Sequence, residues 1–213
     1  MKFYKIAIIS QGYVGLPLAL EFAKYFSVLG FDIDSERIKQ LNEGFDITVE
    51  SDSEKLVENL SIYKISQGEK GYKATNELAE ISDSNVFIVN VPTPIDQYNS
   101  PNLKPLMSAS DMLRGIIKRG DIIIYESTAY SGCTAEECVP VLEKFSSLKF
   151  NKYFFVGYSS ERINPGDKIN TLTSVIKVSS TSTPEVAVKV NNLYKKIITP
   201  RTHIALSIKA AVA

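Results

Sequence analysis

The fold is decided by residues 5–15, which read Lys5-Ile6-Ala7-Ile8-Ile9-Ser10-Gln11-Gly12-Tyr13-Val14-Gly15. An apolar run typical of a buried strand ends in a glycine turn, and an apolar helical pattern follows from Leu16. A strand that passes through such a turn into a helix suits the pyrophosphate of a dinucleotide. Small residues let the backbone approach the phosphates, and the helix start offers N–H groups. Ser10 stands where the first glycine of this motif is expected, so the motif alone is a weak signal.

Composition limits the classes of protein that the chain can be. Its 213 residues suffice for one large domain, or for one domain and the beginning of another. The 24 Lys and Arg residues balance the 24 Asp and Glu residues, which disfavours nucleic acid or an anionic membrane surface as a partner. Apolar runs are too short to span a bilayer and no secretion signal is apparent, so we expect a cytoplasmic location. Two cysteines and one histidine predict neither a disulfide framework nor a metal site.

A carboxylate follows the second predicted strand. A helix is expected from about Tyr13 to Phe26 and a buried strand at Val28–Phe31, which ends at Asp32. This spacing is close to the ~20 residues that separate the glycine turn from the acidic residue that receives the adenosine ribose. A carboxylate there accepts from two ribose hydroxyls and repels a 2′-phosphate, so NAD is favoured over NADP. The alternative is that Asp32 merely caps a helix at 35–42.

The remaining pattern alternates strands with helices. Further strands are expected at 85–91, 121–126, 153–157 and 175–178. Further helices are expected at 53–59, 76–81, 106–118, from Thr134 as cap to 145, and from Pro184 with Thr183 as cap. Residues 44–84 are the least informative part of the chain. The alternation predicts an α/β fold, a Rossmann-like doubly wound and mostly parallel sheet with helices on both faces.

Polar groups follow several of these strands at the point where each strand ends. They are Gly12–Gly15, Asp32, Thr93, Thr128 and Glu161. Ligands bind at the carboxyl ends of the strands in open α/β sheets, so these residues are expected to share one site. The shared position makes a dinucleotide site a strong prediction.

Five short motifs occur in a fixed order along the chain. They are Gln11-Gly12-Tyr13-Val14-Gly15-Leu16-Pro17, Phe31-Asp32-Ile33-Asp34 with Arg37, Val91-Pro92-Thr93-Pro94, Glu126-Ser127-Thr128 and Ser160-Glu161-Arg162-Ile163-Asn164-Pro165-Gly166. In this order they resemble the NAD-dependent nucleotide-sugar 6-dehydrogenases of the UDP-glucose/GDP-mannose dehydrogenase family, and most closely the branch that acts on UDP-N-acetylhexosamines. The resemblance covers essentially the whole chain. It implies oxidation of the sugar C6 alcohol to a carboxylate with two NAD through a cysteine thioester, in bacterial surface polysaccharide synthesis.

The resemblance also implies roles for single residues in cofactor binding. The implied backbone contacts to the pyrophosphate come from Gly12, Tyr13, Val14 and Gly15. Asp32 and Arg37 are implied to hold the adenosine ribose, whereas Thr93 and Thr128 line the path toward the nicotinamide. The alternative for both threonines is that they are loop hydroxyls that bond to local backbone.

The implied catalytic and substrate-binding residues lie at two loops. The resemblance implies that Thr128 also orients a catalytic water and that Glu161 positions or activates water. It further implies that Arg162 and Asn164 face the UDP-sugar substrate. A carboxylate at the reacting centre makes chemical sense because oxidation of an alcohol releases a proton. The alternatives are that Glu161 is a simple helix-start acid and Arg162 a surface arginine.

The chain departs from the family pattern at three positions. Ser10 replaces a glycine, Ser160 replaces the proline before the glutamate, and Val212 occupies a position that is usually acidic. Cys133 is not the family nucleophile, and the family's catalytic lysine, asparagine and cysteine and its UDP-binding domain are expected beyond Ala213. We therefore expect an NAD-binding domain at 1–204 and the truncated start of a linking helix at 205–213.

These departures leave two hypotheses of different classes. The first is that the chain is the NAD-binding domain of a UDP-N-acetylhexosamine 6-dehydrogenase and is inactive alone, with a complementary C-terminal chain or a homodimer as its expected partner. The second is a non-catalytic dinucleotide-binding or interaction module that retains the fold. A different NAD enzyme, such as a hydroxyacid dehydrogenase, does not explain residues 161–166.

Overall fold

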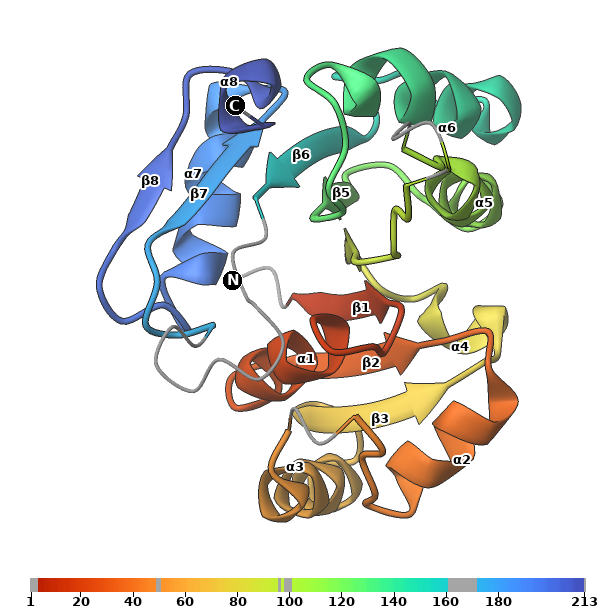
Figure 1. Ribbon diagram of the computed structural model, residues 1–213, viewed down its shortest axis with the longest axis vertical. Coiled ribbons are helices and arrows are strands. Elements are labelled where there is room, and N and C mark those ends of the chain that lie inside the picture. Colours follow the sequence, from red (N-terminus) through yellow and green to blue (C-terminus); the bar gives the residue numbers. More distant parts are fainter. Residues whose placement is uncertain (1–3, 49–50, 96, 98–100, 161–171, 213) are drawn as a thin grey trace.

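An eight-stranded sheet organises the chain (Figure 1). The computed structural model describes residues 4–48, 51–95, 97, 101–160 and 172–212. The strand order is β3-β2-β1-β4-β5-β6-β7-β8, and neighbouring strands are parallel except for the antiparallel pair β6 and β7. The predicted fold class, a doubly wound and mostly parallel sheet, is confirmed.

The bounds of the elements are as follows. The strands are β1 (Lys5–Ile9), β2 (Ser27–Phe31), β3 (Gly71–Thr75), β4 (Val86–Val89), β5 (Ile122–Tyr125), β6 (Phe155–Ser159), β7 (Lys177–Thr181) and β8 (Thr202–Ile204). The α-helices are α1 (Gly15–Ala23), α2 (Ser35–Asn42), α3 (Ser53–Ile65), α4 (Leu78–Ile81), α5 (Lys104–Leu113), α6 (Val139–Ser146), α7 (Pro184–Tyr194) and α8 (Ile208–Val212). A π-helical turn, η1, covers Thr134–Cys138 and leads into α6.

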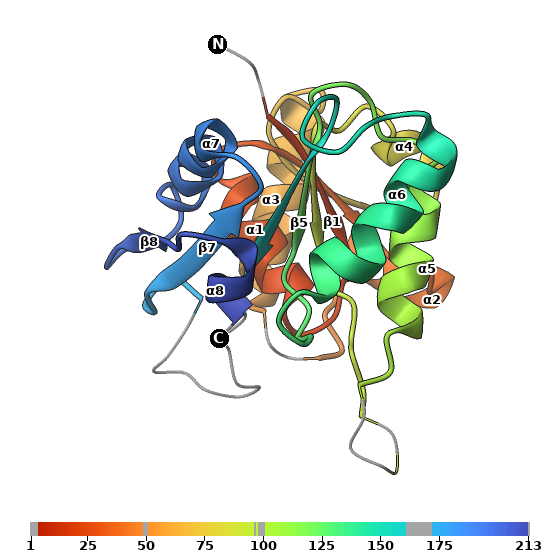
Figure 2. The ribbon, with the colours of Figure 1, turned by 90° about the horizontal axis from the view of Figure 1, so that it is seen from above.

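Successive residues of the central strands face opposite sides of the sheet, and each side has its own core. On β1, Ile6 and Ile8 pack in a cluster with side chains of α1, α3 and α7. Ala7 and Ile9 pack in the other cluster, to which α5 and α6 contribute. Figure 2 shows the sheet between these two layers of helices. Because both faces are covered, the central strands are apolar throughout, which explains why their sequences read as continuous apolar runs.

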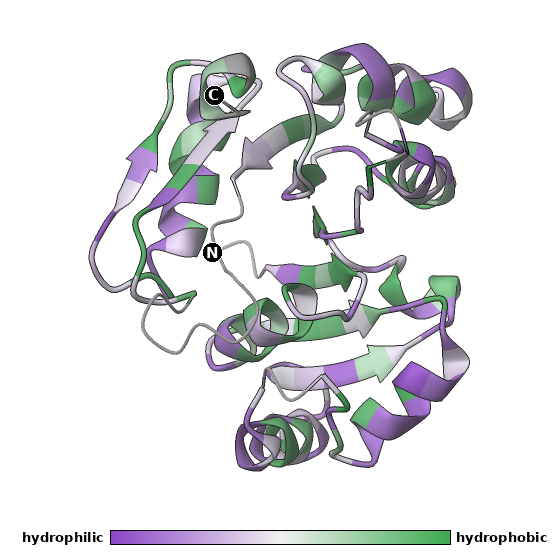
Figure 3. Ribbon diagram, in the orientation of Figure 1, coloured by the Kyte–Doolittle hydropathy of each residue, from purple (hydrophilic) through white to green (hydrophobic). Residues whose placement is uncertain are grey.

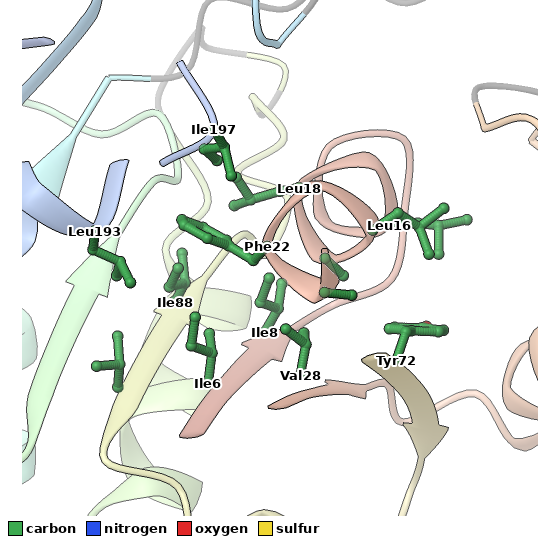
Figure 4. Packing of buried hydrophobic residues seen from close by; sticks show 14 of the residues in the cluster. Ile6, Ile8, Leu16, Leu18, Phe22, Val28, Tyr72, Ile88, Leu193 and Ile197 are labelled. Atoms are coloured by element: carbon green, nitrogen blue, oxygen red, sulfur yellow. The ribbon is translucent and has the colours of Figure 1, made fainter. Parts of the chain in front are cut away.

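Helix α1 fixes the first of the two cores. Phe22 is fully buried and points from α1 toward Ile88 and Leu193 (Figure 4). Its ring centroid lies 5.6 Å from that of Tyr194 at the end of α7. In Figure 3, β1 and β2 are largely hydrophobic whereas α2 is largely hydrophilic. The strand that precedes the glycine turn and the helix that follows it are therefore both held rigidly.

Several predicted elements agree with the structure. The helix predicted at 35–42 coincides with α2, and α7 begins at Pro184 with Thr183 as its cap, since the Thr183 hydroxyl accepts from the N–H of Val186. The other strands and helices predicted in the second half of the chain are present with shifted ends, as is usual for element boundaries. The prediction of a helix over Tyr13–Phe26 was too long, because residues 12–14 form the turn and α1 ends at Ala23.

Two strands were not predicted from the sequence, and the start of one helix was predicted wrongly. Strand β3 is polar and begins at Gly71, whose φ of +97° marks a turn, so it carries no apolar run. Strand β8 has three residues at the far edge of the sheet. Thr134 does not cap a helix; instead it begins the π-helical turn, and no side chain caps that turn. Strand β6 begins at Phe155 because residues 151–153 form a turn.

The close approach of strand and helix at Gly15 gives the first prediction. A Cβ on Gly15 would overlap the backbone carbonyl oxygen of Ser10, whereas a Cβ on Gly12 would meet open space. We expect Gly15→Ala to lower the free energy of unfolding by about 3 kcal/mol, as overpacked cores do. The matched control, Gly12→Ala, stays within about 1 kcal/mol of the natural chain. Urea unfolding measures both, and equal stability of the two variants would contradict this packing.

Candidate dinucleotide site

One pocket collects the carboxyl ends of β1, β4 and β5. It is lined by Ser10, Gly12, Tyr13, Val14, Asn90, Val91, Pro92, Thr93, Glu126, Ser127 and Thr128. Asp32 at the end of β2 joins this group, because its Oδ2 accepts from the Gln11 N–H at 2.7 Å. The structure thus brings together most of the residues that the sequence placed after predicted strands. They come from four strands whose order in the sheet differs from their order in the chain.

The turn between β1 and α1 is built on Ser10 and Gly15. Ser10 has a φ of +78°, a left-handed conformation that glycine adopts freely and other residues adopt at a cost. Its N–H donates to the Phe31 carbonyl at 2.8 Å, which ties the turn to β2. Its carbonyl turns toward Gly15, where only a residue without a side chain fits. Serine therefore replaces the expected glycine in the backbone conformation that the glycine would have.

The start of α1 is suited to an anion. Its N-cap residue, Val14, makes no side-chain cap, and its first turn holds no acidic residue. The first N–H groups of a helix have no intrahelical acceptors and carry the positive end of the helix dipole. Gly12 leaves open space where a Cβ would otherwise project. These features fit a pyrophosphate that approaches the backbone of residues 12–15.

Asp32 is held at the turn by two backbone groups. Its Oδ2 accepts from the Gln11 N–H and its Oδ1 accepts from the Asp34 N–H at 3.1 Å. The hypothesis that Asp32 merely caps α2 is wrong, because Asp34 is the cap and accepts from the N–H groups of Glu36 and Arg37. An ionised carboxylate has about four lone-pair sites, so two remain for hydroxyl donors. This arrangement fits a ribose diol.

Arg37 lies behind the turn, and it is 8% exposed. Its Nε donates to the Gln11 carbonyl at 3.0 Å, and its Nη2 pairs with Asp46 Oδ1 at 2.7 Å. Burial acts to raise the pKa of Asp46, but hydrogen bonds from Thr48, Arg37 and the backbone outweigh it and lower the pKa below its usual value. Nη1 of Arg37 is buried and has no hydrogen-bond partner among the described residues. The implied contact of Arg37 with the adenosine ribose stays a prediction.

Gln11 is part of the glycine-turn motif, but the sequence pattern did not predict the role of its side chain. Its buried side-chain amide donates to the carbonyls of Ile8 and Ser10, and its Oε1 accepts from the Tyr72 hydroxyl at 2.9 Å. Burial raises the pKa of Tyr72 well above its ordinary value, so the phenol stays protonated and donates. A Cβ on Gly30 would overlap this pair. A long polar side chain placed directly after a buried apolar strand, at the start of the turn, is the signal that indicates such a buried network.

Two hydrogen bonds clamp the loops that follow β4 and β5. The Thr93 hydroxyl donates to the Thr128 carbonyl at 2.5 Å, and the Ser127 hydroxyl donates to the Val91 carbonyl at 2.6 Å. The backbone acceptor of Thr93 lies 35 residues away in the chain, so this contact is not the local one of the alternative, and the roles of both threonines stay predictions. The Thr128 side chain remains on the exposed pocket wall. The two threonines are neighbours, as a shared ligand path requires.

Three of the predicted site residues cannot be placed in the structure. Glu161, Arg162 and Asn164 lie outside the described residues, which resume at 172. Within the described part of the chain, no group of three or more His, Cys, Asp or Glu residues is arranged to hold a metal ion. Among the described helices, none combines the length and apolar character that a bilayer crossing requires.

A family model for the NAD-binding domain of the UDP-glucose/GDP-mannose dehydrogenases matches residues 4–198. The chain belongs to this family. Its domain is an NAD-binding domain, which agrees with the anion-binding turn and with the carboxylate at Asp32. The family resemblance inferred from the five motifs is thereby confirmed.

Two relatives that share one name match all or nearly all of the chain. A UDP-N-acetyl-D-glucosamine 6-dehydrogenase from Pseudomonas aeruginosa is 52% identical over 213 residues, which are 100% of this chain and 48% of that protein. A protein of the same name from Salmonella typhi is 47% identical over 98% of this chain and 47% of its own length. The structure of a UDP-D-ManNAc dehydrogenase from Pyrococcus horikoshii aligns with a TM-score of 0.84 at 30% identity, over 97% of this chain and 48% of that one. The chain spans about half the length of the relatives it matches.

The left-handed Ser10 gives the second prediction. Glycine removes the cost of the left-handed conformation, about 1–2 kcal/mol, but it also raises the entropy of the unfolded chain, which costs about 0.5–1 kcal/mol. Because the first effect is larger, we expect Ser10→Gly to raise the free energy of unfolding by about 0.5–1 kcal/mol. Ser147→Gly is the matched control, since the exposed Ser147 has a φ of +55° at the end of α6. Chemical denaturation compares them. A Ser10→Gly variant that is less stable than the natural chain, beside a stabilised Ser147→Gly, would contradict the strain at Ser10.

Proposed function

We propose that the chain is the NAD-binding half of a UDP-N-acetylhexosamine 6-dehydrogenase, which oxidises the C6 alcohol of the sugar to a carboxylate with two NAD. The observation that carries the proposal is the pocket that joins the glycine turn to the ends of β4 and β5. The relatives at 52% and 47% identity, both named for this activity on UDP-N-acetyl-D-glucosamine, support the choice of substrate class.

The cofactor lies across the carboxyl ends of the strands in this proposal. The backbone of residues 12–15 holds the pyrophosphate, and Asp32 holds the adenosine ribose on the β2 side. The carboxylate of Asp32 repels a 2′-phosphate, so NAD is bound in preference to NADP. The other half of the dinucleotide then extends over β4 and β5, toward Thr93 and Thr128. When bound there, NAD supplies the hydride acceptor for the alcohol.

Substrate and proton are assigned to the segment that follows β6. Glu161 takes up the proton or activates water, and Arg162 and Asn164 contact the UDP-sugar. Strand β6 pairs in parallel with β5, so its carboxyl end lies at the same edge of the sheet as the pocket. Thr128 orients the water from the neighbouring strand. These roles follow the family motifs and the edge of the sheet at which β6 ends.

The chain alone does not complete the oxidation in this proposal. A thioester step needs an accessible thiolate, whereas Cys133 and Cys138 are 1% and 0% exposed and pack in the core beside α5 and α6. Residues 1–204 form the NAD-binding domain and 205–213 begin a linking helix. A complementary C-terminal part supplies the nucleophile and the UDP-binding site in this proposal, and the partner is a complementary chain or a second copy of this chain in a homodimer.

One experiment tests the assignment and its limit together. We expect calorimetric titration to show NAD binding to the natural chain, and at least about tenfold weaker binding to Gly12→Ala, whose Cβ occupies the pyrophosphate approach. We expect no steady NADH production when UDP-N-acetylglucosamine is added. Steady NADH production would contradict the claim that the chain is inactive alone.

The same titration separates a second candidate. The strained Ser10 at the pyrophosphate turn favours a degenerate module that retains the fold without the cofactor. Such a module binds neither NAD nor a UDP-sugar. NAD binding by the natural chain that is equal to that of Gly12→Ala would contradict the proposed site itself.

A further inference from the structure

A buried ion pair lies beneath the pocket, at the end of β5, and the site described above does not use it. Glu126 and Lys177 are each 2% exposed, and the Lys177 Nζ lies 3.1 Å from Glu126 Oε2. Glu126 also lines the pocket. Replacing a buried ion pair by apolar residues is often neutral or stabilising, so fold stability by itself gives little reason for such a pair.

The carboxylate of Glu126 joins four elements of the fold. Asn90 at the end of β4 donates its Nδ2 to Glu126 Oε2 at 3.1 Å, and the hydroxyl of Tyr194 at the end of α7 donates to Oε1. Lys177 reaches the same carboxylate from β7, and its Nζ lies 5.4 Å from the centre of the Tyr194 ring. The end of β5 is thereby fixed against β4 on one side and against the antiparallel β7 on the other.

The contact with Asn90 leaves an acceptor at the pocket. Because the Nδ2 of Asn90 is committed to Glu126, its Oδ1 is the free end of the amide, and that atom is buried without a partner among the described residues. Asn90 lines the pocket beside Thr93 and Thr128. An N–H or O–H donor on a ligand would satisfy this oxygen, whose burial without a partner is otherwise costly.

The direction of the cofactor decides which half of it this acceptor meets. The adenosine ribose belongs to Asp32 on β2, which lies on one side of β1, whereas β4 and β5 lie on the other side. The pyrophosphate crosses between them at the turn after β1. The half of the dinucleotide that carries the nicotinamide, with its amide and ribose donors, is therefore the half that reaches Asn90.

We propose that Glu126, balanced by Lys177, is a positioning residue for the nicotinamide riboside half of NAD: it orients Asn90 and fixes the ends of β4 and β5 against which that half binds. The inference rests on the proposed function, because it requires that the dinucleotide occupies the pocket. It assigns no part in the chemical step to either residue.

The test compares NAD with ADP, which carries only the half assigned to Asp32 and the glycine turn. We expect Glu126→Gln to weaken NAD binding about tenfold and to leave ADP binding within about twofold of the natural chain, both measured by calorimetric titration. Asp46→Asn is the control from the adenosine side, and it lowers both affinities together because Asp46 supports Arg37.

A double variant keeps the test decisive if Glu126→Gln alone folds poorly because the charge of Lys177 is no longer balanced by the carboxylate of Glu126. Glu126→Gln combined with Lys177→Met removes both charges, so its urea midpoint returns toward that of the natural chain. The proposal predicts that its NAD affinity, relative to ADP, stays about tenfold low. A double variant that regains both stability and the natural NAD-to-ADP ratio would show a structural role only and overturn the inference. Failure of the natural chain to bind either nucleotide would instead overturn the proposed function along with it.

Discussion

The site depends on one close approach, that of the Ser10 carbonyl to Gly15. The chain must leave β1, reverse its direction into α1 and leave the start of the helix accessible. The left-handed conformation of Ser10 makes the reversal, and Gly12 and Gly15 follow it in the turn. Gly15 makes room for the protein's own backbone, whereas the space beside Gly12 is where we propose that the pyrophosphate binds. A helix start that is uncapped and free of acidic side chains is then held against the sheet by the buried face of α1.

The groups expected to bind the adenosine ribose also hold this turn. Asp32 accepts from the N–H of Gln11, and Arg37 donates to the carbonyl of the same residue. Both sides of one peptide segment are therefore fixed by side chains from β2 and α2, and Gln11 itself is locked by Tyr72 of β3. In the proposed site, binding of the ribose and the shape of the pyrophosphate turn are therefore coupled through Gln11. On the other side of the pocket, the carboxylate of Glu126 plays a comparable role, because it contacts side chains from the end of β4, from β7 and from α7.

The sequence predicted the features that depend on local pattern. The fold class, helix α2, the cap of α7 and the clustering of residues 12–15, Asp32, Thr93 and Thr128 all follow from apolar runs, capping residues and the strand-end rule. Strand β3 escaped because an edge strand that begins at a left-handed glycine needs no apolar run. The pairing of Gln11 with Tyr72 and the partners of Glu126 were not predicted, because these residues lie 61 and 36–68 residues apart in the chain and no local pattern encodes such pairings.

The central claim is that the turn after β1 still holds a pyrophosphate although serine replaces its first glycine. A crystal structure of the chain with NAD tests this most directly. The account predicts phosphate oxygens within hydrogen-bond distance of the N–H groups of residues 12–15, the adenosine ribose on Asp32, and the nicotinamide half over Asn90, Thr93 and Thr128. A dinucleotide bound in the reverse direction, or bound elsewhere with the turn left empty, would contradict it.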